Sequence, residues 1–128
     1  MKPKILLVED DEKIVKALTV RLKSQGYHVV AAYDAVMATA KAMEQHPDVI
    51  LLDISMPGGN GFTVAERLHD SSLTEDIPVI FLTASKEPGL RERARQLGAV
   101  GFLEKPFETQ ELISLIHHAL DGDAALVV

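Results

Sequence analysis

The chain alternates short, mostly apolar runs with longer amphipathic segments, and no other feature restricts its fold as strongly. The runs cover residues 5–8, 28–32, 49–52, 79–82 and 100–103. Between them, apolar residues recur at helical spacing, and Gly or Pro stands at most junctions. Five strands that alternate with five helices predict βαβ units, and therefore a parallel sheet covered by helices on both faces.

The helical segments are recognised by apolar residues that share one helical face. Four such faces are Ile14, Ala17, Leu18 and Leu22; Val36, Ala40 and Met43; Leu90, Ala94 and Leu97; and Leu112, Leu115, Ile116 and Ala119. A fifth helix, from Phe62 to His69, has a weaker pattern. We expect residues 1–120 to form one domain and residues 121–128 to be a C-terminal tail or the start of a linker.

Composition narrows the classes of function. A net charge of −6 argues against direct nucleic-acid binding by this domain. The absence of cysteine excludes disulfides and thiolate metal sites. No signal peptide is visible and no apolar stretch approaches the ~18 residues of a membrane span, so we expect a cytoplasmic domain that does not contact a membrane.

Acidic residues follow two of the apolar runs. Glu9, Asp10 and Asp11 come directly after the first run, and Asp53 closes the third. The carboxyl ends of parallel strands meet at one edge of a sheet, where ligands bind. Two carboxylates ~4 Å apart repel each other by about 4 kcal/mol at an effective dielectric near 20. The pattern therefore predicts a site for a hard divalent cation, because oxygen ligands favour Mg²⁺ or Ca²⁺.

Two further side chains are expected at the same edge. Thr83 ends the fourth run, and Lys105 follows the fifth. Acids from two strands, together with a hydroxyl and an ammonium group, suit phosphoryl transfer. A carboxylate can form an acyl phosphate, a lysine ammonium and a bound cation offset phosphoryl charge, and a threonine hydroxyl donates a hydrogen bond.

Four segments carry a family resemblance: Leu7-Val8-Glu9-Asp10-Asp11, the run from Leu52 to Gly61, Leu82-Thr83-Ala84 and Glu104-Lys105-Pro106-Phe107. In order and in spacing they resemble the signatures of the receiver domain of two-component response regulators, and the likeness extends over residues 4–120. It implies a flavodoxin-like α/β fold, a doubly wound five-stranded parallel sheet in the order 2-1-3-4-5 with five flanking helices.

The resemblance also assigns a phosphoacceptor and a metal site. It implies that Asp53 takes a phosphoryl group from a sensor histidine kinase or a histidine phosphotransfer protein. Mg²⁺, or another divalent ion such as Mn²⁺, would be held by Glu9, Asp10, Asp53 and the backbone carbonyl of Ser55. The chain would then act as a phosphorylation switch in signal transduction. It would not be an enzyme beyond its own phosphorylation and dephosphorylation.

The remaining motif residues take switching roles by the same resemblance. Lys105 would contact the phosphoryl group, Thr83 would donate a hydrogen bond to it, and Phe102 stands at the family's switch aromatic. The face of the fourth helix, fifth strand and fifth helix, from about Lys86 to Leu120, would bind a downstream effector. The sharp turn after the fifth strand, and the resemblance, predict a cis Lys105–Pro106 peptide bond.

Several alternatives compete with this interpretation. Glu9–Asp11 could be a solvated loop at a helix N-terminus, with Asp11 as the helix cap. An aspartyl-phosphate hydrolase would need a second acid two residues after its nucleophile, where this chain has Ser55. A pseudo-receiver typically lacks one of the acids, the threonine or the lysine. A flavin-binding protein of this fold would present glycines and hydroxyls, rather than acids, in its first loop.

Overall fold

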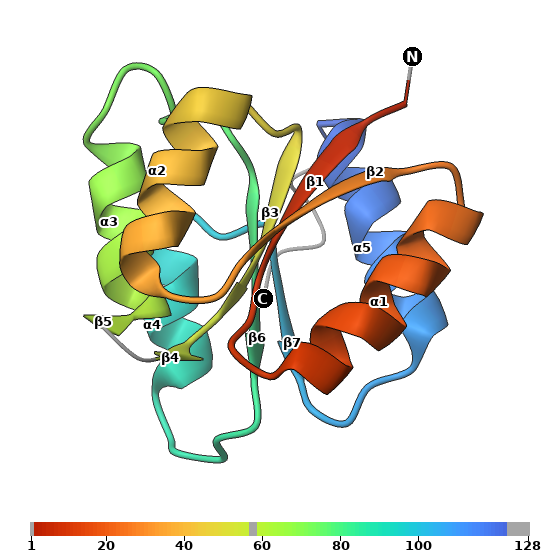
Figure 1. The fold of residues 1–128 in the computed structure, drawn as a ribbon. Helices are drawn as coiled ribbons and strands as arrows, with labels where there is room; N and C mark the ends of the chain where they lie inside the picture. The colour runs from red at the N-terminus through yellow and green to blue at the C-terminus, as the bar shows by residue number, and fades with distance from the viewer. Residues whose placement is uncertain (1, 57–58, 123–128) are drawn as a thin grey trace.

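A five-stranded parallel sheet forms the centre of the computed structural model, which describes residues 2–56 and 59–122 (Figure 1). Its strands are β1 (Lys4–Val8), β2 (His28–Ala32), β3 (Val49–Asp53), β6 (Val79–Thr83) and β7 (Gly101–Glu104). They lie in the order β2-β1-β3-β6-β7. Counted along this sheet alone, that is the predicted order 2-1-3-4-5, so the predicted fold is confirmed.

The helices cover both faces of the sheet, as the alternation of elements requires. In Figure 1, α1 (Glu12–Ser24) and α5 (Thr109–Leu120) lie on one side. On the other side lie α2 (Ala35–Gln45), α3 (Gly61–His69) and α4 (Leu90–Gln96). Within the described residues, no helix combines the length and apolar character needed to cross a membrane.

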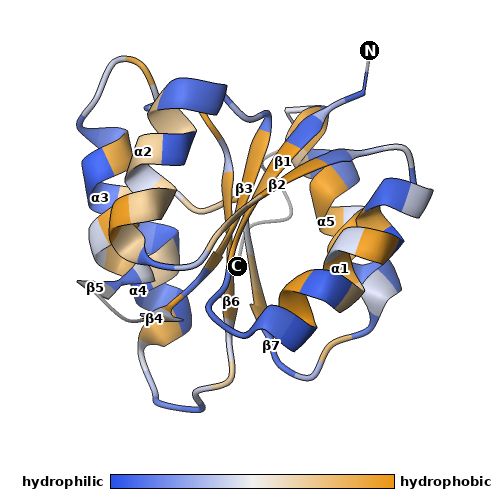
Figure 2. Ribbon diagram, in the orientation of Figure 1, coloured by the Kyte–Doolittle hydropathy of each residue, from blue (hydrophilic) through white to orange (hydrophobic). Residues whose placement is uncertain are grey.

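The three inner strands, β1, β3 and β6, are apolar along most of their length because both of their faces are covered. Successive strand side chains point to opposite faces. Leu6, Ile50 and Phe81 pack with the helices α2, α3 and α4, whereas Leu7 and Leu51 pack with α1 and α5. Figure 2 shows the strands as a hydrophobic centre and the helices as mixed in hydropathy. Two cores, one on each face, therefore hold the sheet rigidly between the helices.

A short antiparallel pair was not predicted. β4 (Ser55–Met56) and β5 (Gly59–Asn60) pair between β3 and α3, with Ser55 opposite Asn60. The sequence indicated only a turn at this place. Strands of two residues carry no periodicity of their own, so no sequence pattern could have shown them. The Asn60 side chain then caps α3 by accepting from the Thr63 backbone N–H at 3.0 Å.

The buried face of α2 differs from the predicted one. The sequence suggested a shared face of Val36, Ala40 and Met43, but Val36 is 69% exposed and Met43 36% exposed. The residues that face the core are small ones, namely Ala35, Ala38 and Ala42. Because α2 is apolar around most of its circumference, the largest apolar side chains do not mark its inner face.

The other predicted helical faces correspond better to the structure. α1 buries Leu18 and Leu22 as expected, but its third buried residue is Val15, and Ala17 is exposed. α3 extends from Gly61 to His69, which confirms the segment with the weaker pattern. The apolar residues chosen for the two helices after β6 face the core, fully or partly buried: Leu90, Ala94, Leu97, Leu112, Leu115, Ile116 and Ala119.

Candidate functional site

The acids that end β1 and β3 do converge. The two strands are neighbours in the sheet, with Val8 opposite Leu52, so the residues that follow lie side by side. Glu9 is only 2% exposed and Asp53 only 5% exposed, whereas Asp10 is exposed. Carboxylate oxygens of Glu9, Asp10 and Asp53 all lie within 4.8 Å of one another. The predicted gathering of three acids at one edge, the lower edge of the sheet in Figure 1, is confirmed.

Lys105 supplies a positive charge inside this cluster. Its Nζ lies 3.1 Å from both carboxylate oxygens of Glu9 and 3.6 Å from Oδ2 of Asp53. Its backbone N–H donates to the carbonyl of Thr83 at 2.7 Å, which fixes the loop after β7 beside the end of β6. The Lys105–Pro106 bond is cis, as predicted. The chain therefore offsets part of the repulsion between its own acids.

Glu9 is the acid most affected by its surroundings. Burial, followed by the hydrogen bond and the charge of Asp53, raises the pKa of Glu9 from 4.5 to about 8, although Lys105 acts in the opposite direction. When no cation is bound, the Glu9 carboxyl therefore holds its proton more tightly than a solvated glutamate does. A metal ion that uses Glu9 must displace this proton, so metal affinity must depend on pH.

The Asp53 side chain is oriented by its own loop. The Ser55 backbone N–H donates to Oδ1 of Asp53 at 3.3 Å, and Oδ2 is the oxygen nearer to Lys105. One oxygen is thus engaged by backbone, while the other points toward a cation. The Ser55 carbonyl as a metal ligand stays a prediction.

Gly61 packs closely against the backbone of Asp53, a contact that the sequence did not reveal. Its N–H donates to the carbonyl of Ile54 at 2.7 Å. A Cβ at this position would lie 2.5 Å from the backbone oxygen of Asp53 and 3.0 Å from the Cα of Ile54. Only glycine lets the first turn of α3 approach the Asp53 peptide so closely. The glycine was visible in the quoted motif, but its purpose depends on a tertiary contact.

Thr83 and Phe102 occupy neighbouring strands beside the acids. Thr83 is fully buried at the end of β6, and its Oγ1 accepts from the Ser85 N–H at 3.0 Å. β6 lies between β3 and β7, so Thr83 stands next to the strand of Asp53. Phe102 on β7 is 6% exposed and packs in the core under α4.

Asp11 takes no part in the cluster. It is the N-cap of α1, and its Oδ1 accepts from the backbone N–H of Lys13 at 2.9 Å. The alternative that Asp11 caps the first helix is therefore confirmed, while Glu9 and Asp10 belong to the acidic site. Three adjacent acids in the sequence thus separate into two different functions.

The donor set fits a hard divalent cation. The three clustered side chains are all carboxylates, and carboxylate oxygens are the ligands that Mg²⁺ and Mn²⁺ favour. One of the three is exposed, which leaves an approach from solvent. This is a property of the residues themselves, and it supports Glu9, Asp10 and Asp53 as the candidate ligands.

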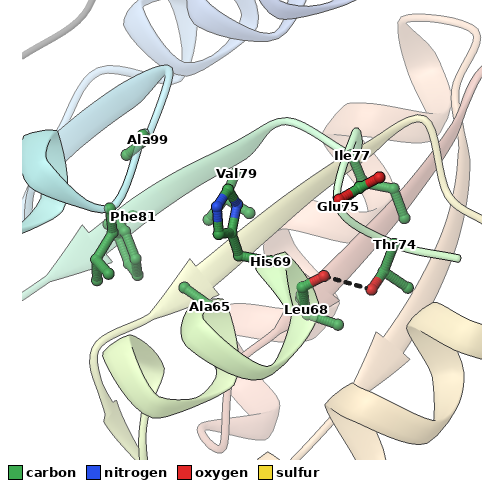
Figure 3. Close-up of a pocket in the computed structure, with 11 residues that line it drawn as sticks. Ala65, Leu68, His69, Thr74, Glu75, Ile77, Val79, Phe81 and Ala99 are labelled. Atoms are coloured by element: carbon green, nitrogen blue, oxygen red, sulfur yellow. Dashed lines mark hydrogen bonds between the residues drawn. The ribbon is translucent and has the colours of Figure 1, made fainter. Parts of the chain in front are cut away.

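A separate cavity lies at the opposite edge of the sheet, near the amino ends of β6 and β7. It has a volume of about 150 Å³ and is lined by residues such as Leu68, Val79 and Ala99 (Figure 3). Its buried hydroxyl, on Thr74, already donates to the Leu68 carbonyl at 2.6 Å. The cavity is therefore a packing gap between α3 and α4, and the chemistry belongs to the acidic edge.

Comparison with known proteins agrees with this geometry. The sequence model of the family described as "Response regulator receiver domain" matches residues 5–117. The chain is 36% identical over 118 residues to the DNA-binding dual master transcriptional regulator RpaA of Synechocystis sp., which covers 92% of this chain and 49% of that protein. It is 40% identical over 116 residues to the response regulator PleD of Caulobacter vibrioides, covering 91% of this chain and 26% of PleD.

A solved structure gives the same result for the fold. The chemotaxis response regulator CheY4 of Vibrio cholerae superposes with a TM-score of 0.86 at 31% identity, covering 94% of this chain and all of that one. The chain spans about half or less of the length of the two curated relatives named above. Because the family model covers most of its length, the chain belongs to the receiver-domain family of two-component response regulators.

Proposed function

We propose that Asp53 is the phosphoacceptor of this receiver domain, and that its donor is a phosphohistidine on a sensor histidine kinase or a histidine phosphotransfer protein. One observation carries the proposal: Asp53 is buried, yet its Oδ2 lies 3.6 Å from the Lys105 ammonium and within a cluster of three carboxylates. An acid held between a cation and a metal-type donor set is suited to receive a phosphoryl group.

The transfer itself is a displacement at phosphorus. An oxygen of Asp53 forms the new P–O bond while the P–N bond of the donor breaks, and the electron pair leaves with the donor imidazole. Lys105 would turn from Glu9 toward the phosphoryl oxygens and compensate their charge. The Thr83 hydroxyl can donate to a phosphoryl oxygen while it still accepts from Ser85, because a hydroxyl does both.

The metal site would be formed by Glu9, Asp10, Asp53 and the backbone carbonyl of Ser55. When bound, Mg²⁺, or Mn²⁺ in its place, supplies charge neutralisation at the transferring phosphoryl group. The protein's own contribution is to hold two of these acids at the ends of the buried strands β1 and β3. The chemistry is then limited to phosphorylation and dephosphorylation of Asp53 itself.

The output would be a change of partner binding on the surface formed by α4, β7 and α5. A phosphoryl group adds about −1.5 to −2 charges at one edge of the sheet. Thr83 and Phe102, on the adjacent strands β6 and β7, would transmit this change to the effector face. We expect this domain to bind no nucleic acid directly, to contact no membrane and to act in the cytoplasm.

The experiment is direct phosphorylation followed by intact-mass measurement. Acetyl phosphate with Mg²⁺ should add one phosphoryl mass to the protein, and EDTA should prevent the addition. Asp53→Asn should abolish most of the labelling. Asp70→Asn is the matched control, because Asp70 is an exposed acid at the far end of α3 and should not matter. Undiminished labelling in Asp53→Asn would refute the assignment.

A further inference from the structure

Helix α4 is held to the rest of the domain by few apolar contacts. The structure describes all seven of its residues, and among them Ala94 alone is buried. Its N-cap is Gly89, which provides no side-chain hydrogen bond to the first turn. Leu90, at its start, and Leu97, just after its end, are partly buried against the core. The position of α4 must therefore depend strongly on the other contacts of its side chains.

Two arginines of α4 lie over aromatic rings of the core. The guanidinium carbon of Arg91 is 4.7 Å from the centre of the Phe102 ring. The guanidinium carbon of Arg93 is likewise 4.7 Å from the centre of the Phe62 ring. A cation at this distance is attracted to the face of an aromatic ring. The two contacts have the same geometry but reach different elements, because Phe102 belongs to β7 and Phe62 to α3.

The Phe102 contact reaches β7, the strand that directly precedes Lys105. Phe102 lies opposite Phe81 of β6, and two residues further along Thr83 lies opposite Glu104. The Lys105 N–H then donates to the Thr83 carbonyl. A shift of Thr83 or Lys105 at the phosphoacceptor site is therefore imposed on the end of β7, within three residues of the Phe102 ring.

We propose that Arg91 is a positioning residue whose contact with the Phe102 ring couples the placement of α4 to the phosphoacceptor site. The inference rests on the proposed function, because it takes Asp53 as the site that changes. Arg93 makes a ring contact of the same geometry to α3 and is also paired with Glu66 of that helix at 3.4 Å, so it holds α4 to α3 rather than to β7. What distinguishes the two arginines is the element that carries the ring, since β7 ends at Glu104, directly before the site residue Lys105.

Neighbouring charges support a defined place for Arg91. Glu104, two residues after Phe102, is paired with Lys86 at 2.8 Å. The hydrogen bond and charge of Lys86 lower the pKa of Glu104, and the charge of Arg91 adds to this effect. The Arg91 charge therefore acts on a carboxylate of β7 while its guanidinium lies over the Phe102 ring of the same strand.

The test measures whether ligand binding at the phosphoacceptor site and the hydrogen exchange of α4 are coupled. Beryllium fluoride with Mg²⁺ mimics an aspartyl phosphate without hydrolysis, so its affinity can be titrated. Amide hydrogen exchange of residues 90–96, followed by mass spectrometry, reports on α4 with and without it. Arg91→Met keeps the aliphatic stem and removes the charge, and Arg93→Met is the matched control. If the Arg91 contact couples α4 to the site, its removal must by linkage change both the α4 exchange and the ligand affinity.

A contact between a cation and a ring at a partly exposed site corresponds to about a two- to fivefold change in an equilibrium. We expect Arg91→Met to change the beryllium fluoride affinity by at least about twofold, and to reduce the ligand-dependent change in α4 exchange. Arg91→Lys keeps a cation and should recover part of the effect. Arg93→Met, which also loses the pair with Glu66, should raise α4 exchange but change the affinity less than Arg91→Met does. Equal effects of Arg91→Met and Arg93→Met on affinity would overturn the inference.

A double-mutant cycle separates this coupling from general loss of packing. In a Phe102→Leu background the ring is gone, so Arg91→Met should have no further effect on affinity. An undiminished effect of Arg91→Met in that background would also overturn the inference. If the parent protein takes up neither acetyl phosphate label nor beryllium fluoride, the proposed function itself fails, and this inference fails with it. If the parent is labelled and Arg91→Met equals the parent, the inference alone fails.

Discussion

The acidic edge and helix α4 are anchored in opposite ways. The acids stand at the ends of β1 and β3. The last four residues of β1 and the first four of β3 have no exposed surface. α4 rests on one buried alanine, on the partly buried Leu90 and Leu97 at its two ends, and on arginines that lie over aromatic rings. A reacting group needs a fixed geometry, whereas an element that responds must have two placements of similar free energy. The comparison suggests that the domain places its chemistry on its most rigid strands and its response on its least anchored helix.

The largest expected effect comes from removing the cation of the acidic edge. Lys105→Met leaves Glu9 and Asp53 buried without their positive partner, and breaking a buried pair in this way costs roughly 3–5 kcal/mol when the charges must persist. Protonation of Glu9 relieves this cost. The destabilisation should therefore be small at pH 6 and large at pH 9, as measured by urea unfolding without metal.

The sign follows from the pKa of Glu9. Its folded value of about 8 lies above its ordinary value of 4.5, so its contribution to stability is complete below about pH 4.5 and is lost as pH rises through about 8. Without Lys105 the pKa of Glu9 rises further, and the loss continues at higher pH. Lys86→Met, which removes an exposed pair with Glu104, should change the stability little at both pH values, because solvent screens the pair. An equal cost of Lys105→Met at pH 6 and pH 9 would contradict the account.

A smaller effect is expected at the backbone contact behind Asp53. Gly61→Ala places a methyl group 2.5 Å from the Asp53 carbonyl oxygen, and forcing atoms into a packed site costs about 1–3 kcal/mol. Because backbone cannot yield as a side chain does, the variant should also label more slowly with acetyl phosphate. Gly101→Ala is the control: the atoms nearest to its methyl would be side-chain atoms of Leu115 and Ile80 at 3.2–3.3 Å. If both variants label at the parent rate, Gly61 does not position Asp53.

The sequence predicted which residues meet at the edge of the sheet better than it predicted which helix residues are buried. The ends of apolar strands placed Glu9, Asp53, Thr83 and Lys105 together, because strand direction alone determines which residues meet. The contact of Lys105 with Glu9 could not be predicted, since it depends on side-chain rotamers across the sheet.

Helix α2 shows the limit of periodicity. Its large apolar residue Val36 is exposed, while Ala38 and Ala42 face the core, because close packing favours small side chains there. The contacts of Gly61 and Arg91 could likewise not be predicted, since each is made with a residue of another element. Local patterns indicate elements and edges, and tertiary contacts decide which side chains act.

The most direct test of the acidic edge is thermal unfolding with and without Mg²⁺. A ligand that binds only the folded state at ten times its dissociation constant adds about 1.4 kcal/mol, or roughly a 4–7 °C rise in Tm for a domain of this size. Asp10→Asn should shrink this rise. Asp11→Asn should not, because Asn still caps α1 and Asp11 lies outside the cluster. A Tm of the parent protein that is indifferent to Mg²⁺ would show that the three acids do not form a cation site.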